Sequence, residues 1–88
     1  MKSFIKTHAM PFNVLAFLTE TDGLTPAQVG AYGLSLMAYW LNDGPIGVEY
    51  FRAICGEESE RVARFYKVSG NMMRHKRLDA QLAKEKAL

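Results

Sequence analysis

Basic side chains near the carboxyl end are the residues of this sequence best suited to chemistry, and that chemistry is anion binding. Residues 64–88 hold seven of the eleven Lys and Arg residues and two acids, so this segment carries about +5. Residues 1–63 hold four basic and seven acidic residues and carry about −3. Such a split indicates a partner rather than a fold. The predicted contacts to nucleic acid or another partner are Arg64, Lys67, Arg74, His75, Lys76 and Arg77.

His75 lies within the run Arg74-His75-Lys76-Arg77 and has two interpretations. In the first, it contacts a phosphate or a base from a basic hairpin and gains charge as the pH falls. In the second, His75 and Arg77 brace the fold through Asp79 or a backbone carbonyl. Tyr66 also has two interpretations, because its ring suits either stacking on a base or packing in the core.

Signatures of catalysis and of metal binding are missing from the sequence. His8, Cys55 and His75 lack the spacing of zinc ligands, and neither type of Gly-rich phosphate loop occurs. Three acids, Glu57, Glu58 and Glu60, are explained by a favourable interaction with the start of a helix. We therefore expect no enzymatic activity, no cofactor and no metal.

Composition indicates one domain, residues 1–88, because a chain this short sustains only one small core. The single cysteine, Cys55, cannot form an internal disulfide and fits a reducing cytoplasm. Apolar runs stay shorter than the roughly 18–20 residues of a membrane span, and we expect neither a membrane segment nor a signal peptide.

The elements that must position the basic residues begin with a long helix from Thr25, where Thr-Pro-Ala-Gln supplies a capping box and a proline at the first helical position. Apolar residues at three- and four-residue steps, including Tyr32 and Trp40, predict that this helix is central to the core. Tyr32, Tyr39 and Trp40 are predicted to be core or interface aromatics rather than a cofactor site. Residues 42–45, Asn-Asp-Gly-Pro, predict its end, with Gly44 in the left-handed conformation.

Residues 46–56 predict one or two extended residues and then a helix of two turns, with Phe51, Ile54 and Cys55 inward and Gly56 as its cap. A second short helix follows, with its three acids in the first turn. Ser69-Gly70-Asn71 then predicts the turn of a β-hairpin formed by residues 65–68 and 72–76.

The two ends of the chain complete the predicted fold. Residues 78–88 have helical composition, with Leu78 and Leu82 one turn apart. Within an N-terminal arm, residues 1–23, the stretch 12–18 fits either a short edge strand or an ordered arm packed under the long helix. The order of elements predicts a mainly α protein with a small β-hairpin, an α+β fold of the winged helix-turn-helix type.

Three segments, MPFNVLAFL, LTPAQVGAYGLSLMAYWLNDGPI and MRHKRLDAQLAKEKA, resemble the YdaU-type family of uncharacterised phage and prophage proteins (domain of unknown function 1376). The resemblance implies a winged-helix-like fold and an association with phage genomes, but no particular activity. Between Gly56 and His75 the chain is shorter than the family pattern, where a winged helix keeps its recognition helix. The residues that match are Leu24, Thr25, Gly30, Ala31, Tyr32, Leu36, Tyr39, Trp40, Gly44 and Pro45, then His75, Lys76, Arg77, Asp79 and Leu82.

Three functions remain open at this point. The first is a phage-derived binding module that contacts nucleic acid or a nucleoprotein complex through its basic hairpin. The second is a phage or mobile-element inhibitor that binds a host protein such as a CRISPR defence complex, as anti-CRISPR proteins do. An oligomeric structural module of a replication complex is a third, more modest alternative. A homodimer is left open for each of the three.

Overall fold

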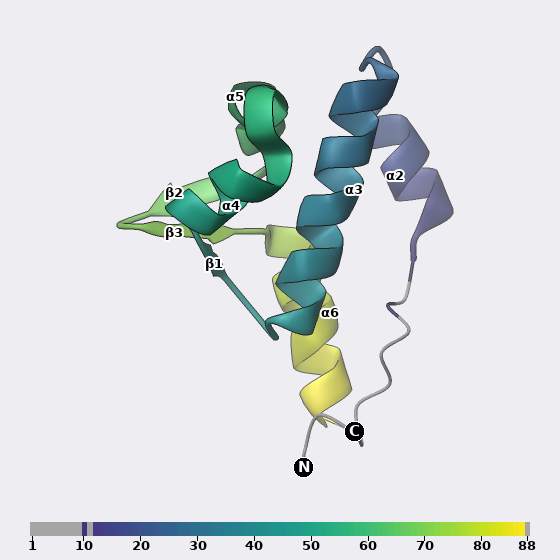
Figure 1. The fold of residues 1–88 in the computed structure, drawn as a ribbon. Helices are drawn as coiled ribbons and strands as arrows, with labels where there is room; N and C mark the ends of the chain where they lie inside the picture. Colours follow the sequence, from purple (N-terminus) through teal and green to yellow (C-terminus); the bar gives the residue numbers. More distant parts are fainter. Residues whose placement is uncertain (1–9, 11, 88) are drawn as a thin grey trace.

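The computed structural model describes Met10 and residues 12–87, and the helices and the small sheet in this part of the chain are drawn in Figure 1. The protein is mainly helical, with a three-stranded antiparallel sheet. The helices are α2 (Val14–Glu20), α3 (Pro26–Leu41), α4 (Val48–Cys55), α5 (Ser59–Val62) and α6 (Lys76–Ala87). The strands are β1 (Ile46–Gly47), β2 (Lys67–Ser69) and β3 (Met72–Arg74), and the 3-10 turns are η1 (Gly56–Glu58) and η2 (Ala63–Phe65).

Helix α3 is the central element, and its start confirms the predicted capping box. The Thr25 hydroxyl accepts the backbone N–H of Gln28 at 3.2 Å, and the Gln28 side chain accepts the N–H of Thr25 at 3.0 Å. The end differs from the prediction, because Asp43 takes the left-handed conformation (φ 64°), whereas Gly44 has φ 149°. The buried residues of α3 are Ala31, Tyr32, Ser35, Leu36, Tyr39 and Trp40.

The N-terminal arm is helical where the structure describes it, so the predicted edge strand for residues 12–18 is wrong. Asn13 caps α2 by accepting the N–H of Ala16 at 2.9 Å, which favours a helix locally. The alternative of an ordered arm against the long helix is confirmed, because the Phe17 ring stacks on Tyr32 with centroids 5.6 Å apart. Residues 1–9 and 11 of the predicted arm lie outside the described residues.

Residues 46–65 follow the prediction closely. Two extended residues, β1, lead into α4, where Phe51 and Cys55 are buried and Ile54 is partly buried. Gly56 caps α4 with φ 58°. The second short helix consists of α5 alone, a single turn, with η1 before it and η2 after it. Glu57 and Glu58 lie in the first turn of η1, and Glu60 in that of α5.

The predicted hairpin is confirmed, with shorter strands than expected, and β1 joins it as a third strand. The sheet order is β1-β3-β2, so β3 is central and pairs with both neighbours. Gly70 takes the positive φ (61°) that a two-residue turn requires. Pairing of β1 with β3 places Ile46 opposite Met73, and both side chains are buried in the core.

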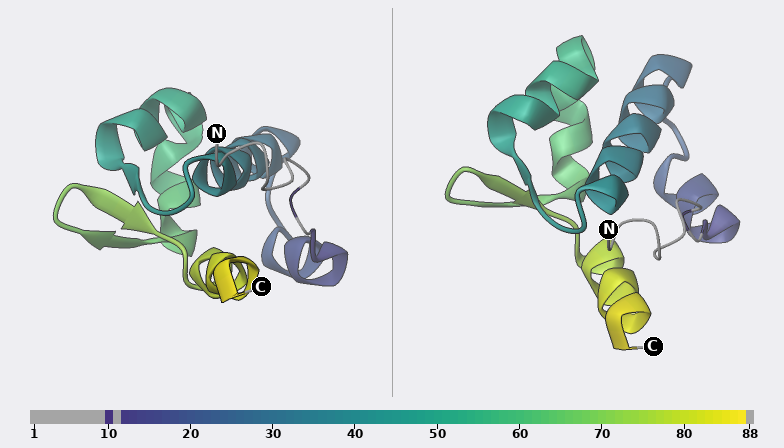
Figure 2. Two further views of the ribbon diagram at one scale, coloured as in Figure 1. Left: turned by 90° about the horizontal axis from the view of Figure 1, so that it is seen from below. Right: turned by 60° about the horizontal axis from the view of Figure 1, so that its bottom comes forward.

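Helix α6 begins at Lys76, two residues before the predicted start at 78, because His75 provides its N-terminal cap. Leu78 and Leu82 pack into the core, and Leu88 lies outside the described residues. In Figure 2, α4, α5 and the hairpin lie to one side of α3, and α2 lies to the other. Helix α6 runs between the hairpin and α2, so it links the two sides of the molecule.

Candidate nucleic-acid interface

The outward face of the hairpin carries two cations directly opposite each other. The register pairs Lys67 of β2 with Arg74 of β3, and both side chains are exposed, whereas Met73 beside them is 1% exposed. Neighbouring residues of a strand point to opposite faces, so burial of Met73 forces Arg74 outward. Like charges opposite each other in a sheet are destabilising by up to about 1 kcal/mol. The pair therefore creates a positive site, and a bound anion would reduce the repulsion between the two side chains.

Internal acids neutralise this face only in part. The Arg74 Nε lies 3.3 Å from the Asp79 carboxylate, and this ion pair is exposed to solvent. Lys67 has no ion pair with any described residue. Exposed ion pairs of this kind contribute little and are screened by salt. Arg74 therefore remains available to a phosphate that competes with Asp79.

Arg64 and Lys76 are exposed and flank the hairpin in sequence, Arg64 in η2 and Lys76 at the start of α6. Neither side chain forms an ion pair within the described part of the chain. Together with Lys67 and Arg74 they make up four of the six predicted contact residues, which we call the hairpin cations. Each of them keeps its charged group at the surface.

His75, unlike the hairpin cations, is buried, with 3% of its surface exposed. Its Nδ1 accepts the backbone N–H of Leu78 at 3.3 Å, so the ring proton lies on Nε2 and is donated to the Tyr32 hydroxyl at 2.9 Å. Burial, and secondarily the positive charge of Arg77, lower the pKa of His75 to about 4. A neutral, enclosed imidazole has no surface to offer a phosphate.

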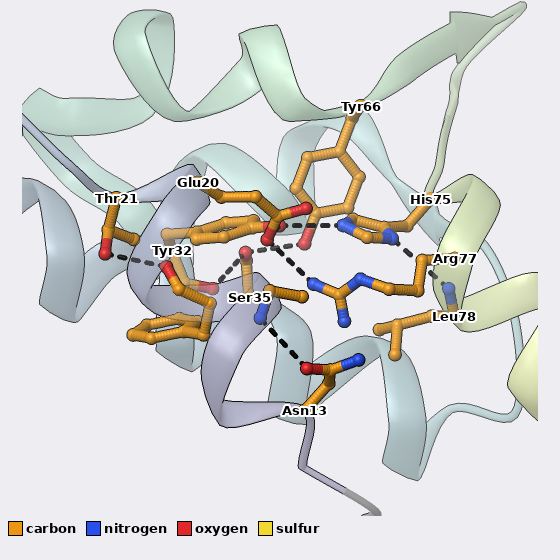
Figure 3. A network of polar contacts seen from close by, with 11 residues as sticks. Asn13, Glu20, Thr21, Tyr32, Ser35, Tyr66, His75, Arg77 and Leu78 are labelled. Atoms are coloured by element: carbon orange, nitrogen blue, oxygen red, sulfur yellow. Dashed lines mark hydrogen bonds and ion pairs between the residues drawn. The ribbon is translucent and has the colours of Figure 1, made fainter.

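Arg77 is also drawn inward, toward Glu20 of α2. Its Nη2 donates to the Glu20 Oε1 at 2.7 Å, and the Tyr32 hydroxyl donates to the same oxygen at 2.8 Å. Figure 3 shows this convergence, in which α2, α3 and α6 each contribute one side chain. Burial and the bond to Glu20 raise the pKa of Tyr32. His75 and Arg77 thus brace the fold, although through Tyr32 and Glu20 rather than through Asp79 or a carbonyl.

Three further hydroxyls, of Ser35, Tyr39 and Tyr66, hold the residues at the base of the hairpin in place. The Ser35 Oγ donates to the Tyr32 carbonyl at 2.7 Å and lies 2.6 Å from the Tyr66 hydroxyl. Tyr39 donates to Asp79 and accepts the backbone N–H of His75 at 3.1 Å. Tyr66 is 9% exposed and packs against Phe51 with ring centroids 5.1 Å apart. Its ring is therefore a core aromatic in this structure and does not offer a face to a base.

A shallow hollow between α2, η2 and α6 lies beside this network. Arg77 and Lys76 contribute positive charge to its lining, but the Glu20 carboxylate faces the same space. The carboxylate opposes an anion there, so the hollow is a weaker anion site than the hairpin face. Its lining consists of Ala16, Glu20, Phe65, His75, Lys76, Arg77 and Ala80.

Sequence reasoning missed Glu20 and named Asp79 only as a partner of His75 and Arg77. Glu20 and Asp79 each receive a tyrosine hydroxyl and an arginine, yet neither acid lies near its tyrosine in sequence. The nearest available signal was the prediction that Tyr32 and Tyr39 are core residues, which burial confirms. A buried tyrosine hydroxyl usually finds a partner, so an unidentified polar partner for each could have been inferred.

The described residues form no other kind of site that adds to this geometry. Among the described residues, no cluster of three or more His, Cys, Asp or Glu could hold a metal ion. Within the same residues, none of the helices has the length and apolar character to cross a membrane. No family model, no curated protein and no solved structure matches the chain.

Proposed function

We propose that this chain is a small binding module that contacts nucleic acid, or a nucleoprotein complex, through the outward face of its hairpin. The observation that carries the proposal is the register that sets Lys67 directly opposite Arg74 on an exposed strand pair. Such a pair is costly in isolation and becomes favourable when phosphates neutralise it. The module acts by occupying its target, without catalysing a reaction.

The order of elements supports a fold of the winged-helix type, in which the hairpin is the wing. Helix α3 is followed by β1, by α4, by the short α5 and then by the β2–β3 hairpin. Strand β1 pairs with β3, so the segment before α4 is tied to the hairpin. This arrangement presents the hairpin as an arm beside the helices (Figure 1).

Contact through the hairpin is favoured over contact through α5, the helix that follows α4. A recognition helix reads base edges with its N-terminal residues. Here α5 is four residues long and follows a turn that carries Glu57 and Glu58. Acids at that position repel phosphates, so we expect backbone contacts from the hairpin cations and little sequence preference.

The setting that we propose, a phage protein acting in the cytoplasm of its host, rests on the resemblance to the YdaU-type family. The segments that carry the resemblance include α3 and the start of α6. In this chain those segments supply Tyr32, Tyr39, His75 and Arg77, which fix the root of the hairpin. The motif that this chain shares with the family would therefore contain the residues that hold the hairpin in place rather than the residues that contact the partner.

The test compares two double variants that remove the same charge. Lys67→Ala with Arg74→Ala removes two hairpin cations, and Lys84→Ala with Lys86→Ala removes two cations of α6. Fluorescence anisotropy with labelled duplex and single-stranded DNA should show binding weakened about tenfold or more by the first change and much less by the second. Equal effects of the two variants, with both proteins folded by circular dichroism, would refute a contact at the hairpin.

The alternative function, inhibition of a host protein such as a CRISPR complex, is favoured by one observation. Glu49, Glu57 and Glu60 are exposed on α4, η1 and α5, where they could occupy a basic nucleic-acid groove of another protein. An inhibitor of this kind would not bind DNA at any salt concentration. Its affinity for the target would fall with Glu57→Lys and Glu60→Lys and would be unaffected by the hairpin variants.

A further inference from the structure

Asp79 lies where the hairpin cations meet the buried network. One carboxylate oxygen, Oδ2, faces the Nε of Arg74 at 3.3 Å, and the other, Oδ1, accepts a hydrogen bond from the Tyr39 hydroxyl. The side chain of Asp79 is 32% exposed, and that of Arg74 is 51% exposed. A single carboxylate therefore contacts the core on one side and the proposed binding face on the other.

The fold holds this carboxylate in place. Tyr39 is fully buried, and its hydroxyl accepts the backbone N–H of His75 at 3.1 Å. Burial and the bond to Asp79 raise the pKa of Tyr39 to about 12, so the hydroxyl keeps its proton and donates it to Asp79 at neutral pH. Asp79 also lies in the first turn of α6, where a negative charge interacts favourably with the helix dipole. The carboxylate thus keeps its position whether or not Arg74 is paired with it.

Arg74 is the more mobile partner of this ion pair. Among the described residues it contacts Asp79 through Nε, at a distance longer than the roughly 2.7–2.9 Å of a strong charge-assisted hydrogen bond. A half-exposed pair of this kind contributes little to stability and is screened by salt. Phosphate and carboxylate oxygens are the same kind of acceptor for a guanidinium. A phosphate can therefore replace Asp79 as the partner of Arg74.

This exchange discriminates between a single phosphate and a chain of phosphates. A single phosphate that takes Arg74 from Asp79 gains one contact, breaks another and leaves the fixed carboxylate as a negative neighbour. A phosphate chain also reaches Lys67, which lies directly opposite Arg74 and has no ion pair with any described residue. The contact with Lys67 breaks no internal bond, and the two contacts reinforce each other because they belong to one ligand.

We propose that Asp79 is a specificity-determining residue of the hairpin: it occupies Arg74 in the free protein, and a nucleic-acid backbone that also contacts Lys67 displaces it, whereas a single phosphate does not. This inference rests on the proposed function, because it names the class of anion that the hairpin cations bind. In the free protein the same ion pair offsets part of the repulsion between Arg74 and Lys67. Asp79 therefore lowers the affinity for DNA and restricts binding to polyanions.

The first test compares two variants of α6 that remove one negative charge each. Asp79→Asn keeps an oxygen for the Tyr39 hydroxyl but removes the charge that holds Arg74. Glu85→Gln is the matched control, because Glu85 is also partly exposed and lies about 9 Å further along the helix. In fluorescence anisotropy with duplex DNA at about 50 mM salt, Asp79→Asn should bind at least about threefold more tightly than the wild type, and Glu85→Gln should change the affinity much less.

An Arg74→Ala background separates exchange of partners from simple repulsion. Without Arg74 there is no ion pair to break, so Asp79→Asn should raise the affinity less than it does in the wild type. Circular dichroism checks that every variant is folded. If the wild type binds DNA and the gain is the same in both backgrounds, or no larger than that of Glu85→Gln, this inference is wrong and the proposed function stands. Absence of DNA binding by both the wild type and Asp79→Asn would overturn the two together.

The second test uses inorganic phosphate as a single anion. For the wild type, sodium phosphate and sodium chloride of equal ionic strength should weaken DNA binding equally, because a single phosphate does not displace Asp79. For Asp79→Asn, phosphate should weaken binding about twofold or more beyond the effect of chloride. A loss of binding specific to phosphate in the wild type would overturn the proposal. Equal effects of the two salts on Asp79→Asn would also overturn it, because Asp79 would then not be the residue that excludes a single phosphate.

Discussion

Replacement of His75 by asparagine gives a quantitative test of the buried polar network. His75 caps α6 through its Nδ1 and donates to Tyr32 through its Nε2. Asparagine is also a favourable N-terminal cap, so His75→Asn keeps the first function, but its shorter side chain does not reach Tyr32. At pH 7 we expect the free energy of unfolding to fall by about 1–3 kcal/mol, the cost of the lost hydrogen bond and imperfect packing.

The pH dependence of this difference is more diagnostic than its size. The fold lowers the pKa of His75 from 6.5 to about 4, so the neutral ring is favoured in the folded protein. Its contribution is complete above pH 6.5 and is lost as the pH falls toward 4. The wild type should therefore lose about 2 kcal/mol more than His75→Asn between about pH 7 and about pH 5.

Urea denaturation followed by circular dichroism at several pH values measures this difference. His8 is present in both proteins, so it does not distinguish the two curves. The stabilities of wild type and variant should converge as the pH falls. Parallel curves over the whole interval would show that the fold does not hold His75 in its neutral form, and the proposed network would then be wrong.

Three other perturbations test the network, the backbone and the core. Glu20→Gln removes the negative charge that Arg77 and Tyr32 share, so the free energy of unfolding should fall by about 1–2 kcal/mol, and the loss should disappear in an Arg77→Met background. Gly56→Ala should lower the free energy of unfolding, measured by urea denaturation, by about 1 kcal/mol. The residue has φ 58°, and the added Cβ meets no atom within 4 Å, so only backbone strain opposes the change. An unchanged stability would contradict that backbone conformation. Burial raises the pKa of the Cys55 thiol to about 11. Alkylation by iodoacetamide near neutral pH should therefore be at least about 100-fold slower in the folded than in the unfolded chain. Equal rates would place Cys55 at the surface.

Local signals in the sequence were sufficient to predict most of the elements. The capping box at Thr25, the cap at Gly56 and the turn at Gly70 each depend on residues a few positions apart, and all three are present in the structure. For residues 12–18 only the strand alternative is wrong, because the apolar residues of this stretch fit either period, whereas the cap at Asn13 favours a helix. The left-handed residue after α3 is Asp43 rather than Gly44, a choice between neighbours that propensity does not resolve.

The buried network could not be predicted, because its partners are distant in sequence. Glu20 and Tyr32 are 12 residues apart, Tyr32 and His75 are 43, and Glu20 and Arg77 are 57. A single sequence shows that His75 and Arg77 are polar and basic, but not which acid or hydroxyl the fold brings to them. These contacts divide the six predicted contact residues into two groups: His75 and Arg77, which point inward and stabilise the fold, and the four hairpin cations.

The salt dependence of DNA binding tests the central claim most directly, because it counts the phosphates that the protein neutralises. If Arg64, Lys67, Arg74 and Lys76 each meet a phosphate, the logarithm of the binding constant should fall against the logarithm of the salt concentration with a slope of roughly −3 to −4. Removal of Lys67 and Arg74 together should reduce that slope by about two. Absence of binding at low salt, or an unchanged slope in the double variant, would contradict the assignment of the hairpin as the contact surface.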